Sequence, residues 1–89
     1  MRILIVEDEA RLASSLQDLL ELNGYTADIS PDGESGLDNA LSGIYDVILL
    51  DVMLPKLDGF AVVQRLRASG NATPVLMLTA RSELSDRVE

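Results

Sequence analysis

The stretch VILLD, residues Val47–Asp51, decides the fold of this chain. Four consecutive apolar residues predict a short strand that is buried on both faces, as strands inside a parallel sheet are. The acid that follows them, Asp51, would lose hydration at the end of such a strand, which costs free energy unless a cation meets it. The same pattern occurs where the apolar run Ile3–Val6 is followed by the acids Glu7–Glu9. Two acidic strand ends predict one acidic pocket.

Apolar runs alternate with amphipathic segments along the chain. The expected strands are Arg2–Val6, Tyr25–Ile29, Tyr45–Leu50 and Pro74–Leu78. The expected helices are Ala10–Leu22, Glu34–Ser42, a third from near Gly59 to Gly70, and the beginning of a fourth at Arg81–Glu89. Strict alternation of strand and helix implies a parallel sheet with helices on both faces, joined by right-handed crossovers. The second strand is more polar than the first and third, so we expect it at an edge of the sheet.

Each of the first three helices carries an apolar stripe at helical spacing. The residues predicted to be buried are Leu12, Leu16, Leu19 and Leu20 in the first helix, Leu37, Ala40 and Leu41 in the second, and Phe60, Val63 and Leu66 in the third. Asp58 is predicted to cap the third helix, because Asp is among the residues preferred at that position. The segment Ser30–Gly33 is predicted to be a turn.

Composition and charge exclude several classes of function. The chain has 89 residues, enough for one domain, and its 7 basic residues are scattered among 15 acids, so no basic surface is available for direct nucleic-acid binding. It has no cysteine and no histidine, which excludes disulfides, thiol catalysis and zinc sites built from those residues. The apolar runs are too short to span a membrane, and the segment after Met1 does not resemble a signal peptide. We therefore expect a cytoplasmic location.

Polar residues follow three of the four expected strands. In open parallel α/β sheets, binding sites form beyond the carboxyl ends of the strands, and here Asp8, Asp51 and Thr79 follow the first, third and fourth strands. In the order 2-1-3-4 of flavodoxin-like, doubly wound sheets, the first and third strands are neighbours, so Asp8 and Asp51 would lie within reach of one cation. We expect Mg²⁺, with a main-chain carbonyl of residues 51–53 as a further ligand. The carboxylate of Asp51 could also act as a nucleophile toward a phosphoryl group.

Each polar residue also has a simpler interpretation when it is taken alone. Asp8 is then more often the cap of the helix that begins at Ala10. Glu7 is more often a solvated surface residue, and Thr79 more often caps the end of a strand. The joint occurrence at three strand ends is what favours a functional pocket.

Three segments, in order along the chain, resemble the receiver domain of two-component response regulators. They are ILIVEDE at Ile3–Glu9, VILLDVMLP at Val47–Pro55 with Asp58-Gly59 behind it, and PVLMLTAR at Pro74–Arg81. The loop after Asp51 is most similar to that of receivers joined to a winged-helix DNA-binding domain. The resemblance covers the whole chain.

The resemblance implies a role for each of these residues. Asp51 would accept a phosphoryl group from a histidine kinase. Asp8, Asp51 and the main-chain carbonyl of Met53 would bind Mg²⁺, and Glu7 would support the ion through water. Thr79 would be the switch hydroxyl that contacts the phosphoryl group. The output would be a DNA-binding domain of the same protein, outside this chain.

Receivers continue beyond the point that corresponds to Glu89, with a fifth strand that ends in a phosphate-binding lysine and a fifth helix. We therefore expect residues 1–89 to be a receiver domain truncated within its fourth helix, with the fifth strand and the last helix missing. The strand Val75–Leu78 would then be an exposed apolar edge, which favours pairing with another chain. This predicts, as an alternative function, an assembly module impaired in phosphorylation that forms homodimers or domain-swapped assemblies.

A third interpretation is a magnesium-dependent phosphohydrolase with an aspartate nucleophile. Such enzymes usually have a second acid two residues after the nucleophile, and this chain has Met53 there. No other residue offers a general acid, so we expect that the chain is not an enzyme.

Overall fold

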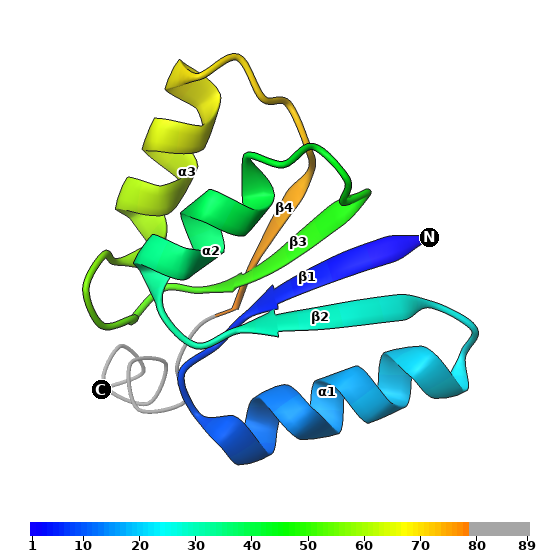
Figure 1. Cartoon of the computed structure of the whole chain (residues 1–89). Helices are drawn as coiled ribbons and strands as arrows, with labels where there is room; N and C mark the ends of the chain where they lie inside the picture. The colour runs from blue at the N-terminus through cyan, green and yellow to red at the C-terminus, as the bar shows by residue number, and fades with distance from the viewer. Residues whose placement is uncertain (79–89) are drawn as a thin grey trace, which may run out of the picture.

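The architecture is a parallel sheet of four strands with helices packed against it (Figure 1). The computed structural model describes residues 1–78, so the helix expected at Arg81–Glu89 lies outside the described residues. The elements are β1 (Arg2–Val6), α1 (Ala10–Leu22), β2 (Thr26–Ser30), α2 (Gly33–Ala40), β3 (Val47–Asp51), α3 (Gly59–Ala68) and β4 (Val75–Leu78). The strand order is β2-β1-β3-β4. This confirms the predicted α/β fold with flavodoxin-like strand order.

The helices cover both faces of the sheet, with α1 on one face and α2 and α3 on the other (Figure 1). Successive residues of β1 point to opposite faces, as in any strand. Leu4 and Val6 therefore pack in one core with Leu66 of α3, while Ile5 packs in a second core with Ala13 of α1. Within residues 1–78, no helix is both long enough and apolar enough to cross a membrane.

The two inner strands, β1 and β3, hold the most deeply buried side chains. Leu4, Ile5 and Val6 of β1 and Leu50 of β3 are completely buried. Their neighbours on both sides are strands, and both faces of the sheet are covered, which explains why these two strands are continuous apolar runs. The more polar β2 forms one edge, as its composition predicted.

The second strand and the second helix, β2 and α2, differ from their predicted bounds. β2 begins and ends one residue later than predicted, and α2 begins at Gly33 and ends at Ala40. The early start of α2 follows from its cap, because the Asp32 carboxylate accepts a hydrogen bond from the Ser35 N–H at 2.8 Å. A capping side chain at this position fixes the first turn of the helix.

The third strand is also displaced from its prediction. β3 begins at Val47, not at Tyr45, and it includes Asp51 instead of ending at Leu50. Asp51 belongs to the strand because it pairs with Leu78 of β4. The acid is therefore held by the sheet itself and not by the loop that follows.

Three apolar side chains that helical spacing predicted to be buried are exposed: Leu19, Leu41 and Phe60. In α1, Leu16 and Leu20 pack against the core and Leu19 lies beside them in solvent. In α3, Val62 replaces Phe60 as the buried residue of the first turn. The buried apolar stripes of these helices are therefore narrower than the helical spacing predicted.

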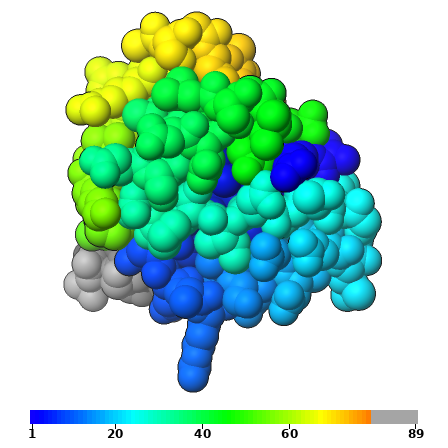
Figure 2. Space-filling model, viewed as in Figure 1, coloured from blue at the N-terminus to red at the C-terminus, as the bar shows by residue number. Residues whose placement is uncertain are grey.

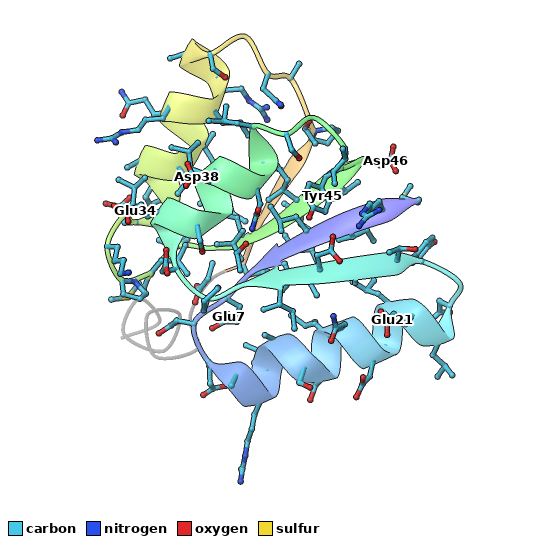
Figure 3. All side chains as sticks on the ribbon, in the orientation of Figure 1. Glu7, Glu21, Glu34, Asp38, Tyr45 and Asp46 are labelled. Atoms are coloured by element: carbon cyan, nitrogen blue, oxygen red, sulfur yellow. The ribbon has the colours of Figure 1, made fainter. Side chains whose placement is uncertain are left out.

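A polar network joins β1, β2 and the start of β3 at the amino end of the sheet. The Tyr45 hydroxyl donates to Asp28 Oδ2 at 2.7 Å, and the Arg2 guanidinium reaches the same oxygen at 3.2 Å. The Arg2 N–H also donates to the Asp46 carboxylate at 2.7 Å. The hydrogen bond from Tyr45, helped by Arg2, lowers the pKa of Asp28. Figure 3 shows Tyr45 and Asp46 at this end of the sheet and Glu7 at the other.

Candidate functional site

The carboxyl ends of β1 and β3 bring three acids together. The two strands are parallel neighbours with Val6 beside Leu50, so the residues that follow lie at the same edge of the sheet. Oxygen atoms of Glu7, Asp8 and Asp51 lie within 4.8 Å of one another. Figure 3 shows Glu7 at this edge. The structure therefore contains the acidic pocket that the two strand ends predicted.

Two of the three carboxylates are buried. Glu7 is 4% exposed and Asp51 is 7% exposed, whereas Asp8 lies in solvent. The interpretation of Glu7 as a solvated surface residue is therefore wrong. Asp51 Oδ1 is buried and has no hydrogen-bond partner among residues 1–78. Burial of a carboxylate oxygen without a partner is costly, so the geometry favours a bound cation.

Glu7 is held in place by its neighbours and by its own backbone. Its N–H donates to the Ser30 carbonyl at 3.0 Å, and its carboxylate accepts from the Glu9 N–H at 2.9 Å. Burial raises the pKa of Glu7 from 4.5 to about 7, although the hydrogen bond from Glu9 opposes this shift. The nearby charges of Asp51 and Asp8 contribute to the same rise in pKa. Glu7 is therefore a group whose charge changes near neutral pH.

The two aspartates predicted as helix caps behave differently. The residue at the cap position of α1 is Glu9, whose side chain makes no capping hydrogen bond, so the interpretation of Asp8 as the cap is wrong. Asp8 belongs instead to the acidic cluster. The Asp58 carboxylate accepts from the Ala61 N–H at 2.9 Å, which confirms Asp58 as the cap of α3.

The loop of residues 52–58 joins β3 to α3 beside the acids. The Val52 N–H donates to the Leu78 carbonyl at 3.1 Å, and the Gly59 N–H donates to the Val52 carbonyl at 2.9 Å. A Cβ at Gly59 would lie 2.9 Å from Val52 Cα, so this approach requires glycine. Met53, the predicted carbonyl ligand, directly follows this anchored residue.

A groove of about 580 Å³ lies between this loop and Asp8. Its lining consists of Asp8, Val52, Met53, Leu54, Pro55, Asp58 and Phe60. Met53 and Phe60 are 56% and 65% exposed because they form its walls. Of the three clustered acids, Asp8 alone lines this groove.

The donor atoms of the pocket fit a hard divalent cation. The cluster offers carboxylate oxygens only, and the chain has no cysteine or histidine to hold a softer metal. Oxygen ligands suit Mg²⁺ and Ca²⁺. A divalent cation would also relieve the repulsion between the acids and give the unpartnered Asp51 Oδ1 a ligand role.

Two further residues concern the site, one of them predicted from the sequence and one not. Thr79, the predicted switch hydroxyl, lies outside the described residues. Gly33, interpreted from the sequence only as part of a turn, donates its N–H to the Pro55 carbonyl at 3.2 Å and so contacts the loop that borders the pocket. The available signal was a glycine in the first turn of a helix, where most other residues form helix better.

Comparison with known proteins identifies a family. The family described as "Response regulator receiver domain" matches residues 3–89. The transcriptional regulatory protein DltR of Streptococcus agalactiae serotype III is 48% identical over 88 residues, which is 99% of this chain and 39% of DltR. The chain therefore spans well under half the length of this relative.

Solved structures agree in fold, and two of them are described with magnesium bound. The receiver domain of sensor histidine kinase PA1611 from Pseudomonas aeruginosa, described with a magnesium ion coordinated in its active-site cleft, is 33% identical with a TM-score of 0.86, covering 99% of this chain and 74% of that one. Response regulator TrrA from Thermotoga maritima, in complex with Mg(2+)-BeF, is 34% identical with a TM-score of 0.83, covering 97% and 78%. These similarities confirm the resemblance seen in the sequence. The chain belongs to the family of response regulator receiver domains.

Proposed function

We propose that Asp51 is the phosphoacceptor of this receiver domain. The observation that carries the proposal is the buried Asp51 carboxylate, whose Oδ1 lacks a partner among residues 1–78 and lies in a cluster with Glu7 and Asp8. In the transfer, a carboxylate oxygen of Asp51 forms a bond to phosphorus. The bond from phosphorus to the histidine nitrogen of the kinase breaks, and its electron pair stays on that nitrogen.

The other residues of the pocket would assist this step. Asp8, Asp51 and the main-chain carbonyl of Met53 would hold Mg²⁺, and Glu7 would support it through water. The ion would neutralise charge on the transferring phosphoryl oxygens. Thr79 would contact the phosphoryl group as the switch hydroxyl. The acidic cluster and the anchored loop at residues 52–58 support the ligand assignment.

The proposal extends to partners of the whole protein. The phosphodonor would be a histidine kinase, and the output would be a DNA-binding domain, as the name of the relative DltR, a transcriptional regulatory protein, suggests. A regulator that acts on bacterial DNA would work in the cytoplasm. The receiver would act as a switch and not as an enzyme, and steady release of phosphate from a small ester would contradict this.

A second candidate function is assembly through β4. In the described part of the chain, β4 pairs with β3 on one side and forms the outer strand of the sheet, and Leu76 is 59% exposed. An apolar outer strand can pair with another chain. We therefore propose homodimers or strand-swapped assemblies as the alternative. Light scattering that shows a folded monomer at high concentration would exclude this candidate.

Phosphorylation of the protein by a small acyl phosphate tests the main proposal. With Mg²⁺ present, intact-mass analysis should show one added phosphoryl group, and the Asp51→Asn variant should show none. The matched control is Asp38→Asn, which changes an exposed acid of α2 (Figure 3) and should be labelled normally. Equal labelling of the Asp51→Asn variant would show that the phosphoacceptor is another residue.

A further inference from the structure

The start of α2 and the loop of residues 52–58 are distant in sequence and meet beside the acidic cluster. In Figure 2 the atoms of α2 and of the segment after β3 form one continuous surface. The contact is made at Pro55 and Leu57, in the same loop as Met53, the carbonyl ligand of the proposed function. We propose that Gly33 is a positioning residue for the magnesium site, because it holds this loop in place. The inference rests on the proposed function and adds to it a residue outside the acidic cluster.

The contact at Gly33 is made by backbone atoms. Gly33 is buried, and its N–H donates to the Pro55 carbonyl at 3.2 Å. A Cβ at this position would overlap the Leu57 carbonyl oxygen and would lie 2.6 Å from the Leu57 carbonyl carbon. Because both partners are main chain, no rotation of a side chain could make room. Only glycine allows the two loops to approach this closely.

The neighbouring residue Asp32 strengthens the same contact. One oxygen of its carboxylate caps α2 by accepting from the Ser35 N–H at 2.8 Å, and the other lies 3.9 Å from Lys56 Nζ. Lys56 has a φ of 72°, which residues with a side chain adopt only when their surroundings hold them there. The side chain of Lys56, which is largely exposed, thus adds a weak ion pair to the contact between this loop and the beginning of α2.

Met53 lies between two anchors of the loop. The first is Val52, which is hydrogen-bonded to Leu78 of β4 and to Gly59. The second is Pro55, whose carbonyl accepts a hydrogen bond from Gly33. Without the second anchor, the backbone at Met53 would be held from one side only. The Met53 carbonyl would then become ordered only when the ion binds. Fixing the backbone of one residue on binding lowers the affinity for Mg²⁺ by about tenfold.

Titration of the protein with MgCl₂, followed by the NMR shifts of the Glu7, Asp8 and Asp51 amides, tests the inference. The Gly33→Ala variant should bind Mg²⁺ about tenfold more weakly than the wild type. The matched control is Gly24→Ala, because Gly24 has a φ of +89° and nothing lies within 4 Å of its missing Cβ. This variant should lose stability through backbone strain and keep its Mg²⁺ affinity. Equal affinity of the Gly33→Ala variant and the wild type would overturn the inference.

A second measurement uses the wild-type protein and does not depend on the variant folding. If the contact between the loops favours Mg²⁺ binding, Mg²⁺ must in turn favour the contact. Saturating Mg²⁺ should therefore slow hydrogen exchange of the Gly33 amide, which bonds to Pro55. Unchanged exchange at Gly33, with Mg²⁺ bound, would overturn the inference and leave the proposed function intact. Absence of Mg²⁺ binding by the wild type would instead overturn the magnesium part of the proposed function, and the inference with it.

Discussion

The carboxyl groups of Glu7 and Asp51 lie within 4.8 Å of each other at the ends of two neighbouring strands, and both are buried. Two carboxylates so close together and so far from water resist being ionised at the same time. Of the two groups, Glu7 is the one whose protonated form is favoured, because burial and the nearby charges raise its pKa to about 7. When all three acids are charged and no cation is bound, the site therefore destabilises the folded chain. The free energy of unfolding should depend on pH for this reason.

In the absence of metal, the free energy of unfolding should fall as pH rises from about 4.5 to about 7. The pKa of Glu7 is higher in the folded chain than its ordinary value of 4.5, so its contribution to stability is complete below pH 4.5 and lost as pH passes through about 7. Denaturant unfolding at a series of pH values measures this. The Glu7→Gln variant should show no such fall, and saturating Mg²⁺ should reduce it in the wild type. A wild-type curve that rises across this range would contradict the role given to Glu7.

Replacement of Asp51 by asparagine should stabilise the protein when no metal is present. Above about pH 7, where Glu7 is also charged, the change removes one of two like charges within 4.8 Å of each other, whose repulsion is roughly 3 kcal/mol at an effective dielectric constant of about 20. Thermal and denaturant unfolding with a chelator measures the gain, and added Mg²⁺ should then stabilise the variant much less than the wild type. Asp38→Asn, at an exposed position on α2, should change stability by less than about 0.5 kcal/mol. Loss of stability in the Asp51→Asn variant would show that the charge is already compensated.

The cap of α3 should contribute measurably to stability. Asp58→Ala removes the acceptor for the Ala61 N–H and should lower the free energy of unfolding by about 1 kcal/mol. Glu9→Ala provides the matched control, because Glu9 has the equivalent position before α1 and makes no capping hydrogen bond. Urea unfolding of both variants compares them. Equal losses would mean that the hydrogen bond at Asp58 is not the source of the effect.

The network at the amino end of the sheet should respond to the loss of one hydroxyl. Tyr45→Phe removes the hydrogen bond to Asp28 and should lower the free energy of unfolding by about 1 kcal/mol. The pKa of Asp28 should rise in the variant, since that hydrogen bond is the main cause of its lowered value. NMR titration of Asp28 measures the shift. Tyr25→Phe, at a tyrosine that is 39% exposed, is the control and should leave the pKa of Asp28 unchanged.

The fold and the acidic pocket were predictable because both follow from short-range patterns. A run such as Val47–Leu50 is apolar on both faces, and such a strand is stable only inside a sheet that is covered on both sides. Parallel strands end at the same edge, so the acid after this run and the acids after Ile3–Val6 had to meet if the strands were neighbours. Neither step requires knowledge of how particular side chains pack.

The misassigned residues depend on packing between elements. Periodicity marks the apolar side of a helix, but it does not say how far the neighbours cover that side, so Leu19 and Phe60 were placed in the core and lie in solvent. Taken alone, Glu7 has the composition of a surface residue, and its burial follows from contacts across the sheet and within its own turn, where its carboxylate accepts from the Glu9 N–H. The approach of Gly33 to Leu57 arises only when two loops meet in space.

The pairing of β1 with β3 has a consequence for the order of events during folding. The ends of these strands come from distant parts of the chain, since Arg2 and Asp46, which are hydrogen-bonded to each other, are 44 residues apart. Closing so long a loop is entropically unfavourable, so we expect this pairing to form later than the helices do. The acids that repel each other meet only once it is complete. A cation that relieves their repulsion would therefore lengthen the lifetime of the folded chain more than it would speed the first collapse.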